Sequence, residues 1–167
     1  MSNSVILLLR VVHIAFGAIW FGGTLNAALF LFPAANPAVL SKDFGTRLVA
    51  RARLLTFTTA AGAIAMIAGF ALYWGIWAGF GFVDPARWYA MGGHFAIVAM
   101  LLTLIIGLPT SHKLRGLGHT IAAQDEPPTI EQNKLGIRLT GRLKWATRLS
   151  AVLLLMTVSL MAIGRYV

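Results

Sequence analysis

Two histidines lie inside long apolar stretches of this 167-residue sequence, and an arginine precedes each of them. His13 follows Arg10 by three residues, and His94 follows Arg87 by seven residues. In an α-helix both spacings place the two side chains on nearly the same face. Ionisable groups are costly in a bilayer and usually face a bundle interior or a bound group. These four residues are therefore the first candidates for a binding site.

Four apolar stretches would hold these residues in a membrane, at about 5–32, 54–77, 88–109 and 145–163. A helix that crosses a bilayer needs about 20 such residues. The sequence is 58% hydrophobic and only 11% charged, whereas about a quarter of a soluble domain is charged. We therefore expect an all-α fold, a single domain over residues 1–167 that forms an integral membrane four-helix bundle with up-down-up-down order. Pro33 is expected to end the first helix.

The cations lie mainly between the apolar stretches and predict the orientation of the bundle. Loops rich in Lys and Arg stay in the cytoplasm. This rule places the segment before the second helix and the polar loop 111–144 inside, with a turn at 124–128 and a short surface helix after Thr129. Both termini are then outside, and we expect a multi-pass protein of the cell inner (plasma) membrane. The net charge of +9 then indicates lipid headgroups as partners of the loops, not nucleic acid.

The predicted orientation brings the two histidines to a similar depth, because the first and third helices both start at the outer face. His94 would lie about 9 Å into its helix. Facing histidines in a helical bundle are a common way to hold haem b in a membrane. Arg10 and Arg87, nearer to water, would bind the haem propionates, and Trp20 would line the macrocycle. The sequence thus predicts haem b between His13 and His94 as metal ligands, in a redox or electron-transfer role.

Other interpretations of these residues stay open. A membrane histidine often only hydrogen-bonds a neighbouring helix, and arginines often reach out to lipid headgroups. Copper transport through His13 and His94 is a weaker alternative, because Cu(I) prefers sulfur ligands and the chain has no cysteine. A non-catalytic subunit of a membrane complex is another. The electron partner, whether a quinone, a porphyrin or another small redox molecule, is not specified. Small residues in the second stretch favour close helix packing, including a homodimer.

A motif that begins at His13, His-x6-Trp-Phe-Gly-Gly, resembles the first helix of two related membrane families. One is the copper-resistance D family, and the other is the four-helix protoporphyrinogen oxidase of haem synthesis (the HemJ type). The resemblance covers Leu9–Pro33 most closely and implies a haem-binding His13 and a haem-dependent oxidoreductase, or copper uptake in the first family. The third helix of the oxidases typically opens with Trp-x-His-x-Lys. In this chain His94 matches the histidine, and Ala96 stands in place of the lysine.

Overall fold

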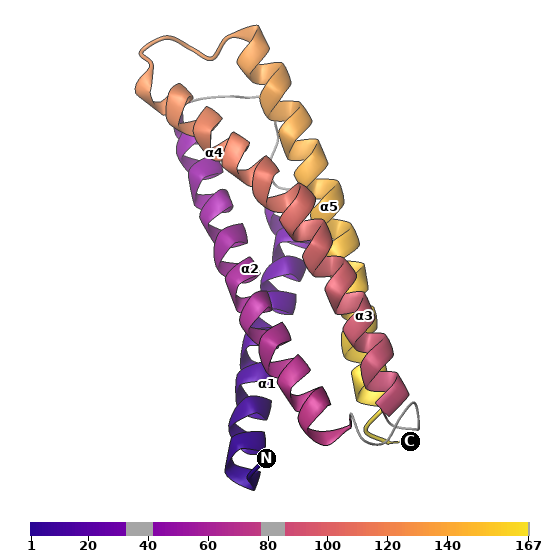
Figure 1. Ribbon diagram of the computed structural model, residues 1–167. Helices are drawn as coiled ribbons and strands as arrows, with labels where there is room; N and C mark the ends of the chain where they lie inside the picture. Colours follow the sequence, from indigo (N-terminus) through magenta and orange to yellow (C-terminus); the bar gives the residue numbers. More distant parts are fainter. Residues whose placement is uncertain (33–41, 78–85, 167) are drawn as a thin grey trace.

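In a computed structural model, the described residues 1–32, 42–77 and 86–166 form a bundle of long helices without any strand (Figure 1). Side chains in the second of these ranges are described from Arg53 onward. The elements are α1 (Asn3–Asn26), the π-helical segment η1 (Ala27–Leu31), α2 (Lys42–Ile76), α3 (Ala86–Leu102), the π-helical segment η2 (Thr103–Gly107), α4 (Leu108–Ala123) and α5 (Ile130–Ile163). The helix stop predicted at Pro33 lies outside the described residues.

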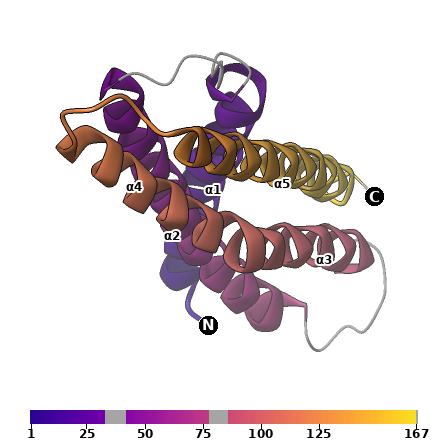
Figure 2. The same cartoon turned by 90° about the horizontal axis from the view of Figure 1, so that it is seen from above.

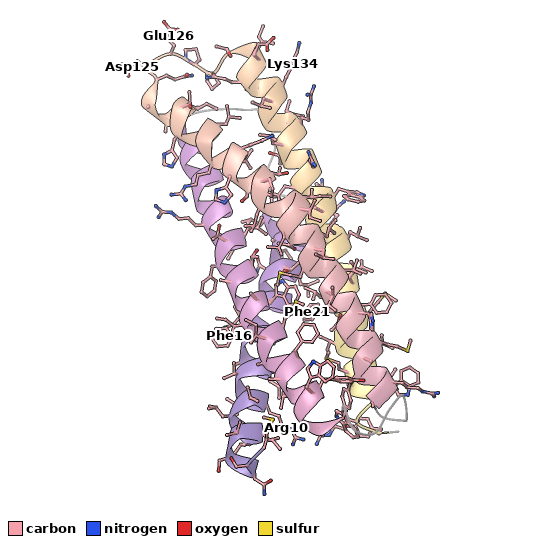
Figure 3. The ribbon with its side chains drawn as sticks, viewed as in Figure 1. Arg10, Phe16, Phe21, Asp125, Glu126 and Lys134 are labelled. Carbon is pink, nitrogen blue, oxygen red and sulfur yellow. The ribbon has the colours of Figure 1, made fainter. Side chains whose placement is uncertain are left out.

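Four stretches of the described chain are helical, long and apolar enough to cross a membrane: Asn3–Leu31, Arg53–Ile76, Ala86–Ala123 and Ile130–Ile163. This confirms the all-α class and the four apolar helices expected from the sequence. Successive stretches run in alternating directions, so the two ends of the chain lie at the same end of the bundle (Figure 1). Arg10 lies toward that end, whereas Asp125, Glu126 and Lys134 lie at the opposite end (Figure 3).

The segment 111–144, predicted as a polar loop, is helical except at 124–129. The predicted turn at 124–128 is confirmed, and so is a helix after Thr129, although this helix is the start of the long α5 and not a short surface helix. The loop predicted at 111–123 was wrong, because these residues belong to α4.

Apolar residues at helical spacing lie between the cations of segment 111–144 and form a buried face. Leu114 and Ile121, seven residues apart in α4, are fully buried, and Leu143 of α5 is almost so. Burial of that face against other helices stabilises a charged helix that an isolated peptide would not keep.

A capping box begins α5 immediately after the non-helical residues 124–129. The Thr129 hydroxyl accepts a hydrogen bond from the Gln132 backbone N–H at 3.2 Å, and the Gln132 side chain accepts one from the Thr129 backbone N–H at 2.8 Å. These two bonds satisfy N–H groups that a helix start otherwise leaves unpaired. The cap therefore fixes where α5 begins.

α1 packs against α2 by placing large side chains over glycines. A Cβ on Gly69 would lie 2.7 Å from His13 Cε1, and a Cβ on Gly62 would lie 2.6 Å from Trp20 Cδ2. Each pair of positions is seven residues apart on its own helix, which is two turns along one face. The His-x6-Trp spacing of α1 therefore matches a Gly-x6-Gly spacing on the antiparallel α2. This match explains why α2 has a small-residue face.

The long helix from α3 to α4 changes its main partner along its length. α3 packs mainly on α5, whereas α4 packs mainly on α2. Figure 2 shows α3 beside α5, and the α1–α2 pair separate from them toward the end with the termini. Within the described residues, α1 and α3 have no extensive contact.

Both π-helical segments keep a buried face in phase with the bundle. Along one face of α5, successive buried residues are separated alternately by three and by four positions, as in a left-handed bundle. At each π segment, by contrast, three buried residues follow one another at intervals of four positions. These are Thr24, Ala28 and Phe32 at η1, and Thr103, Gly107 and Ser111 at η2. A π turn holds one residue more than an α-helical turn, so it absorbs the longer step.

Candidate functional site

His13 lies half-buried on the face of α1 that meets α2. Its Nδ1 is 2.7 Å from the carbonyl oxygen of Ala65. A carbonyl oxygen only accepts, so Nδ1 carries the hydrogen and donates it, and Nε2 keeps a free lone pair. The ring therefore joins α1 to α2, and its other nitrogen keeps a lone pair.

His94 lies on the exposed side of α3 and has the same tautomer. Its Nδ1 donates to the carbonyl oxygen of Ala90, one turn earlier on the same helix, at 2.7 Å. The neighbouring Gly92 is packed on α5, because a Cβ at this position would lie 3.1 Å from the backbone oxygen of Thr157. A Cβ on Gly93, by contrast, would have no atom within 4 Å. The surface beside His94 is therefore open.

The structure does not bring the two imidazoles into contact within one chain. His13 is turned onto α2, and His94 is held by its own helix on an exposed face. Among the described residues, no three His, Asp or Glu side chains are grouped so that they could hold a metal ion. Each histidine thus offers one nitrogen to a ligand that would have to reach its surface.

The two arginines differ in their surroundings. Arg10 is exposed on α1, toward the end of the bundle with the termini (Figure 3). Arg87, also exposed, has its Cζ 5.4 Å from the centroid of the Trp88 ring, a cation–π contact. Both lie on the terminal side of their histidines along the helices, as the spacing predicts.

Trp20 is a core residue, only 4% exposed, and belongs to a cluster with residues of α2, α3 and α5. That cluster contains Ala61, Ala96, Ala99, Met100 and Leu154. Because its ring rests on Gly62, its first role is to set the separation of α1 and α2. It faces the bundle interior, whereas His94 faces outward.

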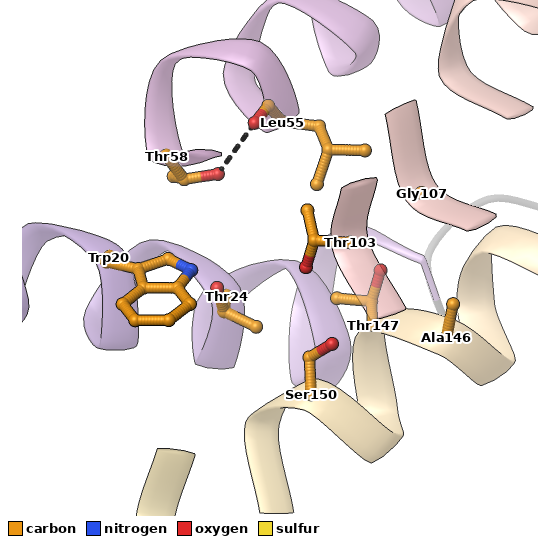
Figure 4. A pocket seen from close by; sticks show the side chains of 9 residues that line it. All are labelled: Trp20, Thr24, Leu55, Thr58, Thr103, Gly107, Ala146, Thr147 and Ser150. Atoms are coloured by element: carbon orange, nitrogen blue, oxygen red, sulfur yellow. Dashed lines mark hydrogen bonds between the residues drawn. The ribbon is translucent and has the colours of Figure 1, made fainter. Parts of the chain in front are cut away.

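A small polar cavity next to Trp20 was not predicted from the sequence. Nine residues line it: Trp20, Thr24, Leu55, Thr58, Thr103, Gly107, Ala146, Thr147 and Ser150 (Figure 4). Its volume is about 10 Å³. The available signal was the occurrence of hydroxyl side chains at helical spacing inside apolar stretches, which alone does not show that they converge.

These features define an all-helical protein with four membrane-length helices and a histidine within each of two of them. The chain matches no family model, and comparisons with curated proteins and with solved structures find no similar protein. The resemblance carried by the motif at His13 therefore stays a prediction from the sequence.

Proposed function

We propose that this protein is a membrane-embedded b-type haem protein with a redox or electron-transfer role. The observation that supports the proposal most is the shared tautomer of His13 and His94. A histidine that ligates a metal almost always donates its other ring N–H to a carbonyl or carboxylate, which fixes the ring and raises its basicity. Both histidines make such a bond at 2.7 Å, so Nε2 keeps the lone pair that would ligate iron.

The space available constrains where the macrocycle would lie. Two cavities of the described bundle have volumes of about 10 Å³ each, which is far too small for haem. Haem would therefore lie against an open helix surface. The exposed side of α3 around His94 and Gly93 offers one, and Gly17, one turn after His13, also has no atom within 4 Å of a Cβ position.

The residues around such a site would have two roles, to ligate the iron and to bind the propionates. Because the two imidazoles do not meet within one chain, His13 and His94 would ligate the same iron only where their two surfaces came together, as in a homodimer. Arg10 and Arg87 would bind propionates, for which planar guanidinium groups are well suited. When bound, haem supplies a reversible one-electron couple. The electron partner would be a small molecule that reaches the site through the bilayer, such as a quinone or a porphyrin.

A visible spectrum of the purified protein in detergent tests the proposal. We expect a reduced b-type band, with haem quantified as its pyridine adduct. A colourless protein that binds copper would indicate copper transport, and a colourless protein that binds neither would indicate a non-catalytic subunit. A coloured protein that oxidises protoporphyrinogen would narrow the role to the oxidase-like enzyme.

The proposed orientation has both termini outside the cell and the α4–α5 connection in the cytoplasm. Exposed cations follow one face of α5 at Lys134, Arg138 and Arg142, at the end opposite the termini. Trp145 is 58% exposed, and Arg148, nearly one turn further on, is the last exposed cation of α5; from Val152 to Ile163 the large exposed side chains are apolar. An aromatic residue at such a boundary is typical of a membrane interface, and cations beyond it favour the cytoplasm.

Reporter fusions would check this orientation in the inner membrane. A reporter active only outside should be active when fused at Val167 and inactive when inserted after Pro128. A reporter active only inside should give the reverse pattern and serves as the matched control. Inside activity at Val167 would contradict the proposed topology.

A further inference from the structure

The polar cavity beside Trp20 is formed by groups from four separate elements. Trp20 and Thr24 come from α1, Thr58 from α2, Thr103 from η2, and Thr147 with Ser150 from α5. Figure 4 shows hydroxyls of η2 and α5 gathered around the cavity, with the Trp20 ring nitrogen directed toward Thr24. Polar groups from four helices thus meet in the interior of an apolar bundle.

Three of these hydroxyls lack a protein partner, although they are deeply buried. Thr24, Thr147 and Ser150 are 6%, 4% and 3% exposed, and within the described part of the chain none of them makes a hydrogen bond. A buried hydroxyl without a partner is costly in free energy. Since these three face one cavity, a shared ligand would satisfy them together.

Several other hydroxyls in the bundle are satisfied within their own helix. The hydroxyls of Thr58, Thr103 and Thr157 donate to carbonyl oxygens three or four residues earlier, at 3.0, 2.9 and 3.0 Å. This backbone bond is the usual solution for Ser and Thr in an apolar helix. Thr24, Thr147 and Ser150 make no such bond. Among the described residues the buried Thr140 hydroxyl also lacks a partner, but it does not line the cavity.

The size of the cavity selects the ligand. A volume of about 10 Å³ corresponds to one water molecule, which needs two to four polar partners. Hydroxyls both donate and accept, and the Trp20 N–H donates, so a water would find both kinds of partner here. We infer that this cavity is a specific site for one buried water that links α1, η2 and α5.

The π turn of η2 contributes to this site. Thr103 and Gly107, its first and last residues, both line the cavity. A Cβ on Gly107 would lie 3.5 Å from Thr103 Cγ2 and 3.7 Å from Leu55 Cδ2, which are ordinary contacts. The glycine therefore leaves space that a methyl group could occupy, and π turns often occur at functional sites.

A structure at a resolution that shows ordered solvent tests the inference on the unmodified protein. We expect density for a single water within hydrogen-bonding distance, about 2.7–3.2 Å, of at least two of Thr24, Thr147 and Ser150. An empty cavity in such a map would overturn the inference, and so would hydroxyls that rotate to bond backbone carbonyls instead.

Thr147→Val gives a second test, because a bridging water and a dry cavity predict different changes in melting temperature. If a water bridges the hydroxyls, the loss of one partner should lower the melting temperature in detergent by about 2–4 °C. If the cavity is dry, removing an unpaired hydroxyl should leave the melting temperature unchanged or raise it. Thr157→Val, which removes a hydroxyl bonded to its own helix, is the matched control for the loss of a buried hydroxyl.

Discussion

Replacement of Gly62 by leucine should prevent this protein from folding into a stable bundle. A Cβ at this position would lie 2.6 Å from Trp20 Cδ2 and 2.8 Å from Met100 Cε, so both side chains would have to move. Trp20 is buried in a core cluster, and the cavity of about 10 Å³ beside it is far too small to take a displaced indole ring. Smaller overpacking changes already cost about 1–3 kcal/mol. We expect loss of the monodisperse peak in size-exclusion chromatography, or a melting temperature lowered by more than about 10 °C, several times the shift per kcal/mol.

Three variants would identify the α1–α2 register as the cause. Ala63→Leu alters the next residue of α2, which is exposed, and Gly22→Leu alters an exposed glycine of α1 that has no atom within 4 Å of its Cβ position. Both should fold nearly as the wild type. Combining Gly62→Leu with Trp20→Ala should recover part of the lost stability, because the two sites are coupled through one contact. If Gly62→Leu and Ala63→Leu were equally stable, the register would be wrong.

His94→Ala should remove the low-spin haem spectrum without destabilising the fold. The His94 ring is exposed and bonds only to its own helix, so its loss leaves no interior cavity. His13→Ala should remove the spectrum and also lower the melting temperature, because it empties the space over Gly69 and leaves the Ala65 carbonyl without the imidazole. Visible spectra, melting curves and low-temperature electron paramagnetic resonance would measure these effects.

Two other histidines of the chain provide control variants for His13→Ala and His94→Ala. His112 and His119 are exposed on α4, at least 18 residues along the chain from either proposed ligand, and their alanine variants should keep the spectrum. A low-spin signal that survives in His94→Ala would refute ligation by both histidines. A high-spin signal in the wild type would do the same and would favour His13 as a single ligand.

The sequence predicted the helices better than their ends. An apolar stretch of about 20 residues leaves a chain few alternatives in a bilayer, because every backbone group must be bonded internally. Within 111–144 the turn at 124–128 was predicted, but the helical structure of 111–123 and the length of the helix after Thr129 were not, because cations dominate the composition there. The apolar residues Leu114, Ile121 and Leu143 that hold it in helices pack against partners distant in the sequence.

The candidate site was predictable only within single helices. The shared face of His13 and Trp20 follows from their spacing alone, and the structure places both against α2. That His13 meets Gly69 depends on the packing of two separate helices, which no local pattern specifies. The cavity depends on four elements and on the phase of η2, so the convergence of Thr24, Thr147 and Ser150 could not be predicted from local spacing.

The extra residue of η2 has a consequence for which insertions and deletions the chain can accept. One residue corresponds to about 100° of rotation in an α-helix. Deleting one residue between 103 and 107 would therefore turn the whole of α4, so that Leu114 and Ile121 would leave the core and their charged neighbours would enter it. A change of length at 124–129, between two helices, would rotate neither of them. An insertion or deletion within α3–α4 should thus be tolerated only where it leaves the rotation of α4 unchanged. A deletion at Ile105 should therefore be harmful even though this residue is exposed.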